Sequence, residues 1–137
     1  VIIDFINKLE NNPQKLEILG DGTQKKSYLH IDDAIAATIH LFQRFTIDGK
    51  EYDIYNVGND DWITVKELAS IIVKEMGLKD VRYIFRPGTR DGRGWPGDVK
   101  LMLLDISKLK NSGWKPRMNS REAVRKAVRQ ILMERGF

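Results

Sequence analysis

The sequence predicts a small α/β domain, because helical patterns and short strand-like runs alternate along 137 residues. Apolar residues make up 42% and charged residues 31% of the chain, which is a globular composition. No apolar run approaches the roughly 20 residues of a membrane span. Because the sequence shows no secretion signal, we expect a cytoplasmic protein that is not inserted in a membrane. The absence of cysteine excludes disulfides.

The first element is a helix that is already under way at residue 1. Asn11, Asn12 and Pro13 end it. No capping residue precedes its pattern, so we expect that the preceding polypeptide is missing, with a frayed natural terminus as the alternative. The apolar residues that recur at helical spacing are Ile2, Ile3, Phe5, Ile6 and Leu9.

Short strands and turn signals separate the helices that follow. Gly20-Asp21-Gly22 is a turn signal. Asp32 or Asp33 is the expected cap of the second helix, which ends before Asp48-Gly49. The apolar face expected for that helix consists of Ile35, Ala36, Ile39, His40 and Phe42. Strands are expected at 15–19, 27–31, 52–57, 81–85 and 100–104.

Three further helices complete the pattern. Thr64 and Glu67 form a capping box that starts the third helix, and Gly77 ends it. Asp105 is expected to cap a short helix at 106–111, and the last helix is expected at 120–135.

Residue constellations typical of catalysis are missing from the sequence. It contains no Gly-x-Gly-x-x-Gly after a strand, so a dinucleotide fingerprint is missing, and it contains no P-loop and no nucleophile elbow. His30 and His40 lie among apolar residues, which favours packed histidines over general bases. Helix capping accounts for Asp32 and Asp33 without a metal. We therefore predict no catalytic and no metal-ligating residue in this chain.

The most informative stretch is the loop at 86–98, which is rich in arginine and glycine. Arginine forks match phosphate oxygens, and a tryptophan offers a flat contact surface. Arg90, Arg93, Trp95 and Asp98 would therefore suit a nucleotide diphosphate, with Asp98 accepting bonds from sugar hydroxyls. A solvated loop whose arginines pair with acidic residues elsewhere is an equal alternative on composition alone.

The last helix carries a second group of basic residues. Arg121, Arg125 and Arg129 lie four residues apart on one face, a stripe that could follow nucleic-acid phosphates. A solvated helix face is the commoner meaning of such a stripe, and no aromatic residue lies between these arginines. We therefore predict no nucleic-acid partner.

Several motifs, taken in order, carry a resemblance to a known family. They are residues 20–33 (GDGTQKKSYLHIDD), 55–58 (YNVG), 64–69 (TVKELA), 96–98 (PGD), 105–108 (DISK) and 113–116 (GWKP). The whole chain resembles the C-terminal half of NAD-dependent nucleotide-sugar epimerases and dehydratases, which are extended short-chain dehydrogenases/reductases. Among them, the resemblance extends to UDP-glucose 4-epimerase. The resemblance implies that residues 1–137 form one nucleotide-sugar-binding domain of a longer chain.

The resemblance also implies binding positions, with departures. Lys26 stands where the family usually has the pyrophosphate-binding arginine, and Tyr28 and Asp98 match the pattern. Leu19 stands where an aromatic residue often stacks on the base, and Trp95 replaces an arginine. We expect Arg90 or Arg93 to supply the missing charge.

The function that the resemblance implies belongs to the whole enzyme. In this family an N-terminal Rossmann domain binds NAD and carries the catalytic Tyr-x-x-x-Lys pair. Nothing in this sequence matches that pair or the glycine-rich fingerprint that follows a strand in such a domain. A UDP-glucose 4-epimerase-like reaction, in which the C4 of the sugar is oxidised and reduced again, is the first expectation. A 4,6-dehydratase and a non-catalytic binding or regulatory homologue are the alternatives. The implied substrate is a UDP- or dTDP-sugar, and the implied full-length assembly is a homodimer.

Overall fold

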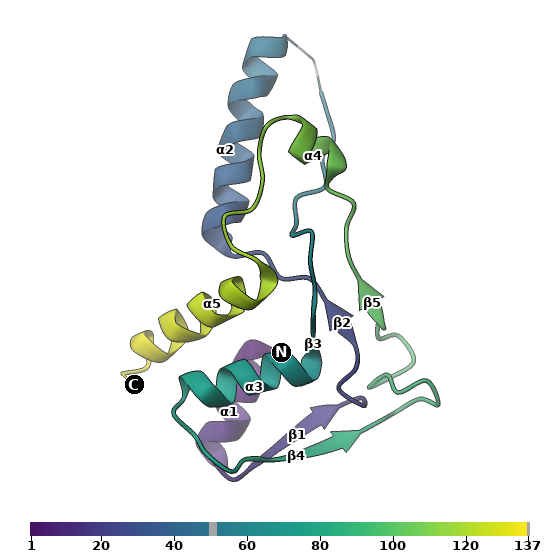
Figure 1. Ribbon diagram of the computed structural model, residues 1–137, viewed down its shortest axis with the longest axis vertical. Helices are drawn as coiled ribbons and strands as arrows, with labels where there is room; N and C mark the ends of the chain where they lie inside the picture. Colours follow the sequence, from purple (N-terminus) through teal and green to yellow (C-terminus); the bar gives the residue numbers. More distant parts are fainter. Residues whose placement is uncertain (50–51, 137) are drawn as a thin grey trace.

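Two groups of buried apolar side chains organise the fold, and they lie at opposite ends of an elongated molecule (Figure 1). The structure is a computed structural model that describes residues 1–49 and 52–136. The larger group joins the elements drawn in the lower part of Figure 1. These are α1 (Ile2–Asn11), β1 (Lys15–Leu19), α3 (Val65–Glu75) and α5 (Ser120–Glu134).

The larger core follows directly from the periodicity of the sequence. Ile6 and Leu9 of α1, with Ile72 of α3, are at most 1% exposed. Leu16 and Ile18 of β1 are fully buried, while their neighbours alternate toward solvent. Each fully buried side chain of this size contributes about 1.5–3 kcal/mol to folding. The predicted positions of the first helix and the first strand are confirmed, although Ile3 of the expected apolar set is 55% exposed.

Two small sheets frame this core. In the first, β1 runs parallel to β4 (Arg82–Arg86), with Lys15 opposite Arg82. In the second, β2 (Lys25–Lys26) lies between an antiparallel β3 (Ile63–Thr64) and a parallel β5 (Leu101–Met102). Parallel partners need long crossover connections, and α3 lies in the chain between β1 and β4. The strand expected at 100–104 is thus present but shorter.

The predicted capping box at Thr64 is confirmed. The N–H of Glu67 donates to Thr64 Oγ1 at 3.1 Å, and the N–H of Thr64 donates to Glu67 Oε2 at 2.8 Å. At the other end of α3, Gly77 adopts a left-handed conformation with φ of 67°, as its place after the apolar stripe predicts. Asn119 and Glu122 form a second capping box at the start of α5.

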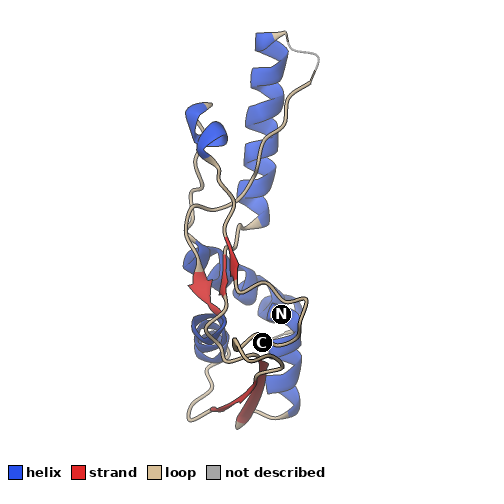
Figure 2. Cartoon of the chain, turned by 90° about the vertical axis from the view of Figure 1, so that its right-hand side faces the viewer, coloured by secondary structure: helices blue, strands red, loops and turns tan. Residues whose placement is uncertain are grey.

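The smaller core lies in the upper part of Figure 1, between α2 (Ile31–Asp48) and α4 (Ser107–Asn111). Figure 2 shows α2 rising beyond the sheets, so this region forms an extension of the larger body. The buried residues of this core are Ala37, Ile106, Leu109 and Trp114. The N-cap residue of α4 is Ile106 and not the expected Asp105, although the Asp105 carboxylate accepts the N–H of Ser107 at 2.8 Å.

Two expected strands are wrong. Strand β2 ends at Lys26, so residues 27–31 are not a strand. The reason is that side chains satisfy the backbone of Tyr28: its N–H donates to Ser120 Oγ at 3.0 Å, and its carbonyl accepts from Asn59 at 3.1 Å. Residues 52–57 form no strand either, although their exposure alternates. The Ile54 carbonyl there accepts from the Lys108 ammonium at 2.8 Å.

The expected cap and apolar face of α2 are also wrong. His30 is the N-cap residue, and its Nδ1 accepts the N–H of Asp32 at 3.2 Å. The inward row of α2 is Asp33, Ala37 and Leu41, because this row faces the Trp114 cluster and the segment before α5. The predicted inward residues Ile35, Ile39 and Phe42 are 52%, 53% and 70% exposed.

Candidate functional site

A cavity of about 650 Å³ lies between the end of β1, residues 24–28 and the segment 95–99, with α1 along one wall. It brings together five of the seven residues that the sequence predicted for a substrate site. These are Leu19, Lys26, Tyr28, Trp95 and Asp98. They come from three separate stretches of the chain, so their convergence is a property of the fold.

Asp98 is the polar centre of this cavity. Its side chain is buried and accepts from Gln24 Nε2 and Lys26 Nζ, both at 3.1 Å, and from the Gly94 N–H at 3.4 Å. Burial raises the pKa of the Asp98 carboxyl, but the hydrogen bonds from Gln24 and Lys26 outweigh it. The pKa therefore lies below 3.8, and Asp98 is ionised at neutral pH.

Lys26 supplies the positive charge beside Asp98. Its ammonium lies 3.1 Å from Asp98 Oδ1 and also donates to the carbonyl of Val99. Its side chain is 20% exposed and lines the cavity, and the Asp98 carboxylate balances its charge. Such a group can bind an anion as a point charge, without the bidentate geometry of an arginine.

Apolar side chains form the rest of the walls. Leu19 and Trp95 are 49% and 52% exposed, which leaves large apolar surfaces open at the cavity. The loop packs closely against the end of β1 at Gly94. A side chain would not fit there, because a Cβ on Gly94 would lie 2.9 Å from the Cβ of Leu19. Burial raises the pKa of the Tyr28 phenol to about 12, so Tyr28 is neutral. Flat apolar walls of this kind suit a planar ring.

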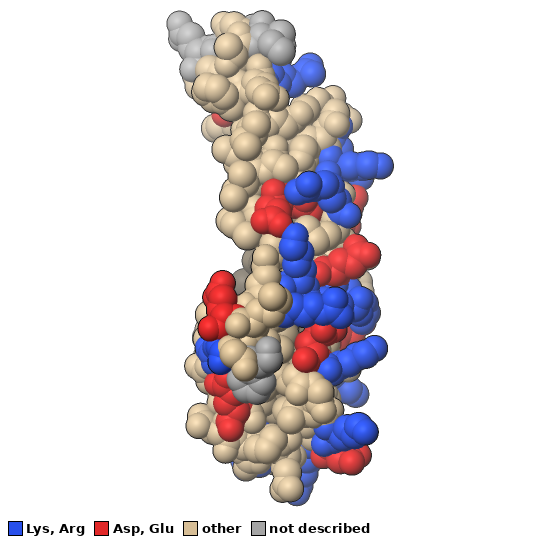
Figure 3. All heavy atoms as spheres, turned by 90° about the vertical axis from the view of Figure 1, so that its left-hand side faces the viewer, with Lys and Arg blue, Asp and Glu red and all other residues tan. Residues whose placement is uncertain are grey.

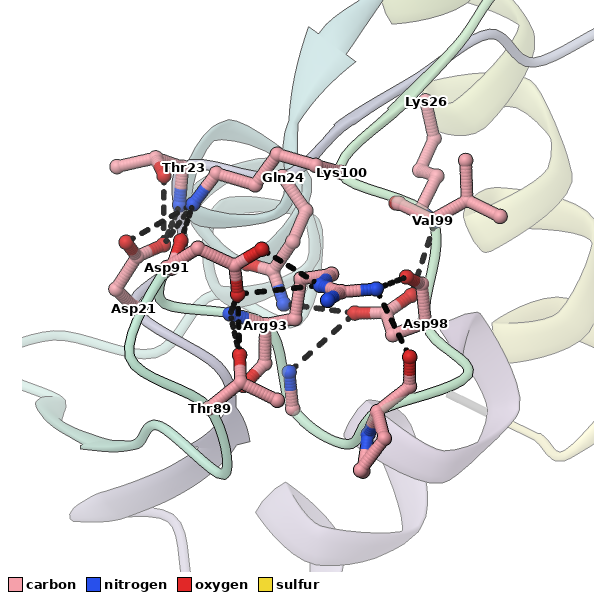
Figure 4. Close-up of polar contacts among 12 residues, drawn as sticks. Asp21, Thr23, Gln24, Lys26, Thr89, Asp91, Arg93, Asp98, Val99 and Lys100 are labelled. Atoms are coloured by element: carbon pink, nitrogen blue, oxygen red, sulfur yellow. Dashed lines mark hydrogen bonds and ion pairs between the residues drawn. The ribbon is translucent and has the colours of Figure 1, made fainter.

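The two arginines that were predicted for the site do not line the cavity. Arg90 is exposed. The Arg93 guanidinium binds within its own loop, at Asp91 and at the carbonyls of Pro96 and Asp98 (Figure 4). The substrate contacts expected of Arg90 and Arg93 stay predictions.

Sequence reasoning missed the wall that α1 provides. Val1, Asp4, Phe5 and Lys8 line the cavity, and the Lys8 ammonium lies 2.9 Å from Asp4 Oδ2. The interpretation of this helix considered only its apolar face. One feature of the sequence could have indicated this wall: Asp4 and Lys8 have opposite charges and lie one helical turn apart on the same face.

The other candidate groups have structural partners. Arg121 pairs with Glu67 of α3 at 2.6 Å, and Arg125 and Arg129 both pair with Glu75. In Figure 3 the basic side chains along one edge alternate with acidic ones. His30 is 4% exposed, and its Nε2 lies 2.8 Å from Gln130 Oε1.

The described residues form no group of side chains typical of a metal centre. Within residues 1–49 and 52–136, no three His, Cys, Asp or Glu side chains group as metal ligands would. Over the same described ranges, no helix has the length and apolar character needed to cross a membrane.

Comparison with known proteins places these features in a wider group. The family model described as GDP-mannose 4,6 dehydratase matches residues 1–127. A putative UDP-glucose 4-epimerase of Methanocaldococcus jannaschii is 29% identical over 128 residues, covering 93% of this chain and 37% of its own length. The GDP-L-fucose synthase of Escherichia coli K12 is 31% identical over 115 residues, or 80% of this chain and 34% of its own.

Solved structures agree with the sequence relatives. A crystal structure of UDP-galactose 4-epimerase superposes with a TM-score of 0.77 and 38% identity, over 97% of this chain and 40% of that one. UDP-glucose 4-epimerase of Thermotoga maritima, solved with UDP-glucose, shares the fold with a TM-score of 0.71 and 22% identity, over 97% of this chain and 39% of that one. The chain thus spans less than half the length of these proteins, and it belongs to the NAD-dependent nucleotide-sugar epimerase/dehydratase family, matching its C-terminal part.

Proposed function

We propose that residues 1–137 form the nucleotide-sugar-binding domain of a UDP-glucose 4-epimerase-like enzyme, and that this domain is not catalytic alone. One observation carries the proposal. Lys26, Asp98, Trp95, Leu19 and Tyr28 converge on a single cavity of about 650 Å³, a volume typical of small-molecule sites. Relatives solved with UDP-sugars support the choice of ligand class.

The chemistry of the cavity suggests a role for each side chain. The Lys26 ammonium binds a phosphate oxygen, and the ionised Asp98 accepts hydrogen bonds from the sugar hydroxyls. The base lies against Trp95 and Leu19, whose exposed apolar surfaces lose contact with water when it binds. Because Lys26 and Asp98 already hold each other 3.1 Å apart, the ligand has to compete with this ion pair.

The chemical step takes place outside this domain. When bound by the Rossmann part that we propose for the full enzyme, NAD would supply the hydride chemistry at C4 of the sugar. The residues of this chain would bind and orient the nucleotide, so that the sugar faces that part. A 4,6-dehydratase built on the same domain would use the same contacts, and a non-catalytic homologue would keep them without turnover.

Ligand-observed NMR tests the proposal. Saturation transfer from the 137-residue chain to UDP, UDP-glucose or dTDP-glucose is expected, and Asp98→Asn should weaken it. Asp60→Asn is the matched control, because Asp60 also pairs with a lysine, Lys110 at 2.9 Å, but lies outside the cavity. No transfer to any of the three ligands, or equal transfer in both variants, would contradict the proposal.

The cytoplasmic location and the homodimer stay predictions. Cell fractionation and light scattering of the full-length enzyme, respectively, would test them. Activity of that enzyme on UDP-glucose, with UDP-galactose as the product, would separate an epimerase from a dehydratase. The dehydratase would instead form a 4-keto-6-deoxy sugar.

A further inference from the structure

The guanidinium of Arg93 is engaged by its own loop from two sides. Its Nε lies 2.9 Å from Asp91 Oδ2 and 3.1 Å from Asp91 Oδ1. Its Nη1 donates to the carbonyl of Pro96 at 2.8 Å and to the carbonyl of Asp98 at 3.0 Å. Figure 4 shows the guanidinium between Asp91 and the segment that ends at Asp98.

These contacts close a turn that contains two residues of the cavity. The N–H of Asp98 donates to the carbonyl of Trp95 at 3.0 Å, and the N–H of Gly94 reaches the Asp98 carboxylate at 3.4 Å. Both cavity residues, Trp95 and Asp98, therefore lie within a segment whose far end is tied to Arg93.

We propose that Arg93 is a positioning residue, which holds Trp95 and Asp98 in place for the ligand and does not contact the ligand itself. The inference deepens the proposed function and rests on it for the identity of the ligand. It assigns Arg93 a role other than the phosphate contact expected from the sequence, because Nε and Nη1 of the guanidinium already donate to partners within the loop.

Charge balance supports this role. A hydrogen bond from the Thr89 hydroxyl and the Arg93 guanidinium lower the pKa of the Asp91 carboxyl to about 2. Asp91 is therefore ionised near neutral pH, and it neutralises Arg93 within the loop. A guanidinium that is compensated in this way attracts a phosphate less than a free one does.

The geometry also explains why the residue is an arginine. Nε and Nη1 lie in one rigid plane and donate in two directions, to a carboxylate on one side and to two carbonyls on the other. A lysine ammonium sits at the end of a flexible stem and would reach one of these sides. We therefore expect Arg93→Lys to behave like Arg93→Ala.

The base of the loop is anchored separately. The Lys100 ammonium lies 3.1 Å from Asp21 Oδ2 and donates to the carbonyl of Asp91 at 2.8 Å. The N–H of Asp21 donates to the carbonyl of Gly92 at 2.8 Å. Because these bonds do not involve Arg93, its removal should loosen the turn at 93–98 without detaching the loop from β1.

Binding of two ligands distinguishes positioning from direct contact. NMR titrations of uridine and UDP are made with the wild type, Arg93→Ala, Arg93→Lys and the control Arg86→Ala. Arg86 is an exposed arginine that also pairs with a carboxylate, Glu17 at 3.2 Å, and it lies outside the cavity. Positioning predicts that both Arg93 variants weaken the binding of uridine and of UDP alike, by about tenfold (about 1.4 kcal/mol), and that Arg86→Ala changes neither. A loss confined to UDP would overturn the inference, because it would mean a phosphate contact.

A second measurement needs no ligand, so it tests the positioning role of Arg93 separately from the proposed nucleotide-sugar binding. The indole N–H signal of Trp95 is expected to shift in Arg93→Ala, and added ethylguanidinium chloride should restore it where sodium chloride at the same ionic strength does not. An unchanged Trp95 signal in Arg93→Ala would refute positioning, whatever the chain binds. If wild type binds neither uridine nor UDP while the signal shifts and is restored, the proposed function fails and the structural role of Arg93 stands.

Discussion

The buried carboxylate of Asp33 gives the sharpest test of the energetics of this fold. Asp33 is 0% exposed and ties α2 to the segment that precedes α5. It accepts the N–H groups of Arg117 and Met118, both at 3.1 Å, and Arg117 Nε at 2.8 Å. Replacing Asp33 with alanine leaves these two backbone N–H groups without their acceptor.

The expected loss of stability follows mainly from the two bonds that the backbone N–H groups donate. Each backbone N–H bond to a charged acceptor contributes about 1.5–3 kcal/mol. The Arg117 side chain is 66% exposed, so its ion pair with Asp33 adds little beyond them. We expect Asp33→Ala to lower the free energy of unfolding by about 3–5 kcal/mol, a large part of the stability of a domain of this size.

Urea denaturation followed by circular dichroism measures this loss. Asp60→Ala is the control, because Asp60 and its partner Lys110 are both about half exposed, and its loss should stay below about 1 kcal/mol. A loss below 1 kcal/mol for Asp33→Ala, or equal losses for the two variants, would refute the reasoning.

The same variant predicts a pH dependence. Burial raises the pKa of the Asp33 carboxyl, but the hydrogen bonds from Arg117 and Met118 outweigh it and bring the pKa below 3.8. A carboxyl with a lowered folded-state pKa stabilises the fold above its unfolded-state pKa and loses this contribution as the pH falls through the folded value. The stability difference between wild type and Asp33→Ala should therefore be constant near neutral pH and shrink below about pH 4.

Three further variants test local features by the same denaturation assay. Thr64→Ala removes the capping box of α3 and should cost about 1 kcal/mol; no measurable change would contradict the cap. Gly94→Ala would place a Cβ 2.9 Å from that of Leu19 and should cost about 1–3 kcal/mol, whereas Gly97→Ala meets its nearest atom at 3.4 Å and should cost less. Phe42→Ser should change the free energy of unfolding by less than about 0.5 kcal/mol, because Phe42 is 70% exposed. A loss above about 2 kcal/mol would instead indicate that Phe42 is buried, as the sequence pattern predicted.

Features set by neighbouring residues were predictable from the sequence. Thr64 and Glu67 stand three residues apart, so their mutual hydrogen bonds follow from helix geometry alone. The alternation of Leu16 and Ile18 with polar neighbours likewise identified β1. Such signals lie within one turn or one strand and need no knowledge of the remaining fold.

Features that depend on distant partners were not predictable. The inward row of α2 is set by Asp33 meeting Arg117, 84 residues away. The strand expected at 27–31 is absent because Tyr28 bonds to Ser120, 92 residues away. At the site, the resemblance identified Lys26 and Asp98 as candidates, but no sequence pattern showed that the Arg93 guanidinium would bond within its own loop.

The separation of the two cores has a consequence for how the protein tolerates sequence change. The Trp114 core in the upper part of Figure 1 contributes no residue to the cavity, whose walls come from α1, the end of β1, residues 24–28, Val65 and the segment 95–102. Substitutions around Trp114 can therefore alter the stability of the extension while the geometry of the cavity is preserved. The shape of the cavity and the size or composition of the extension are thus free to diverge independently.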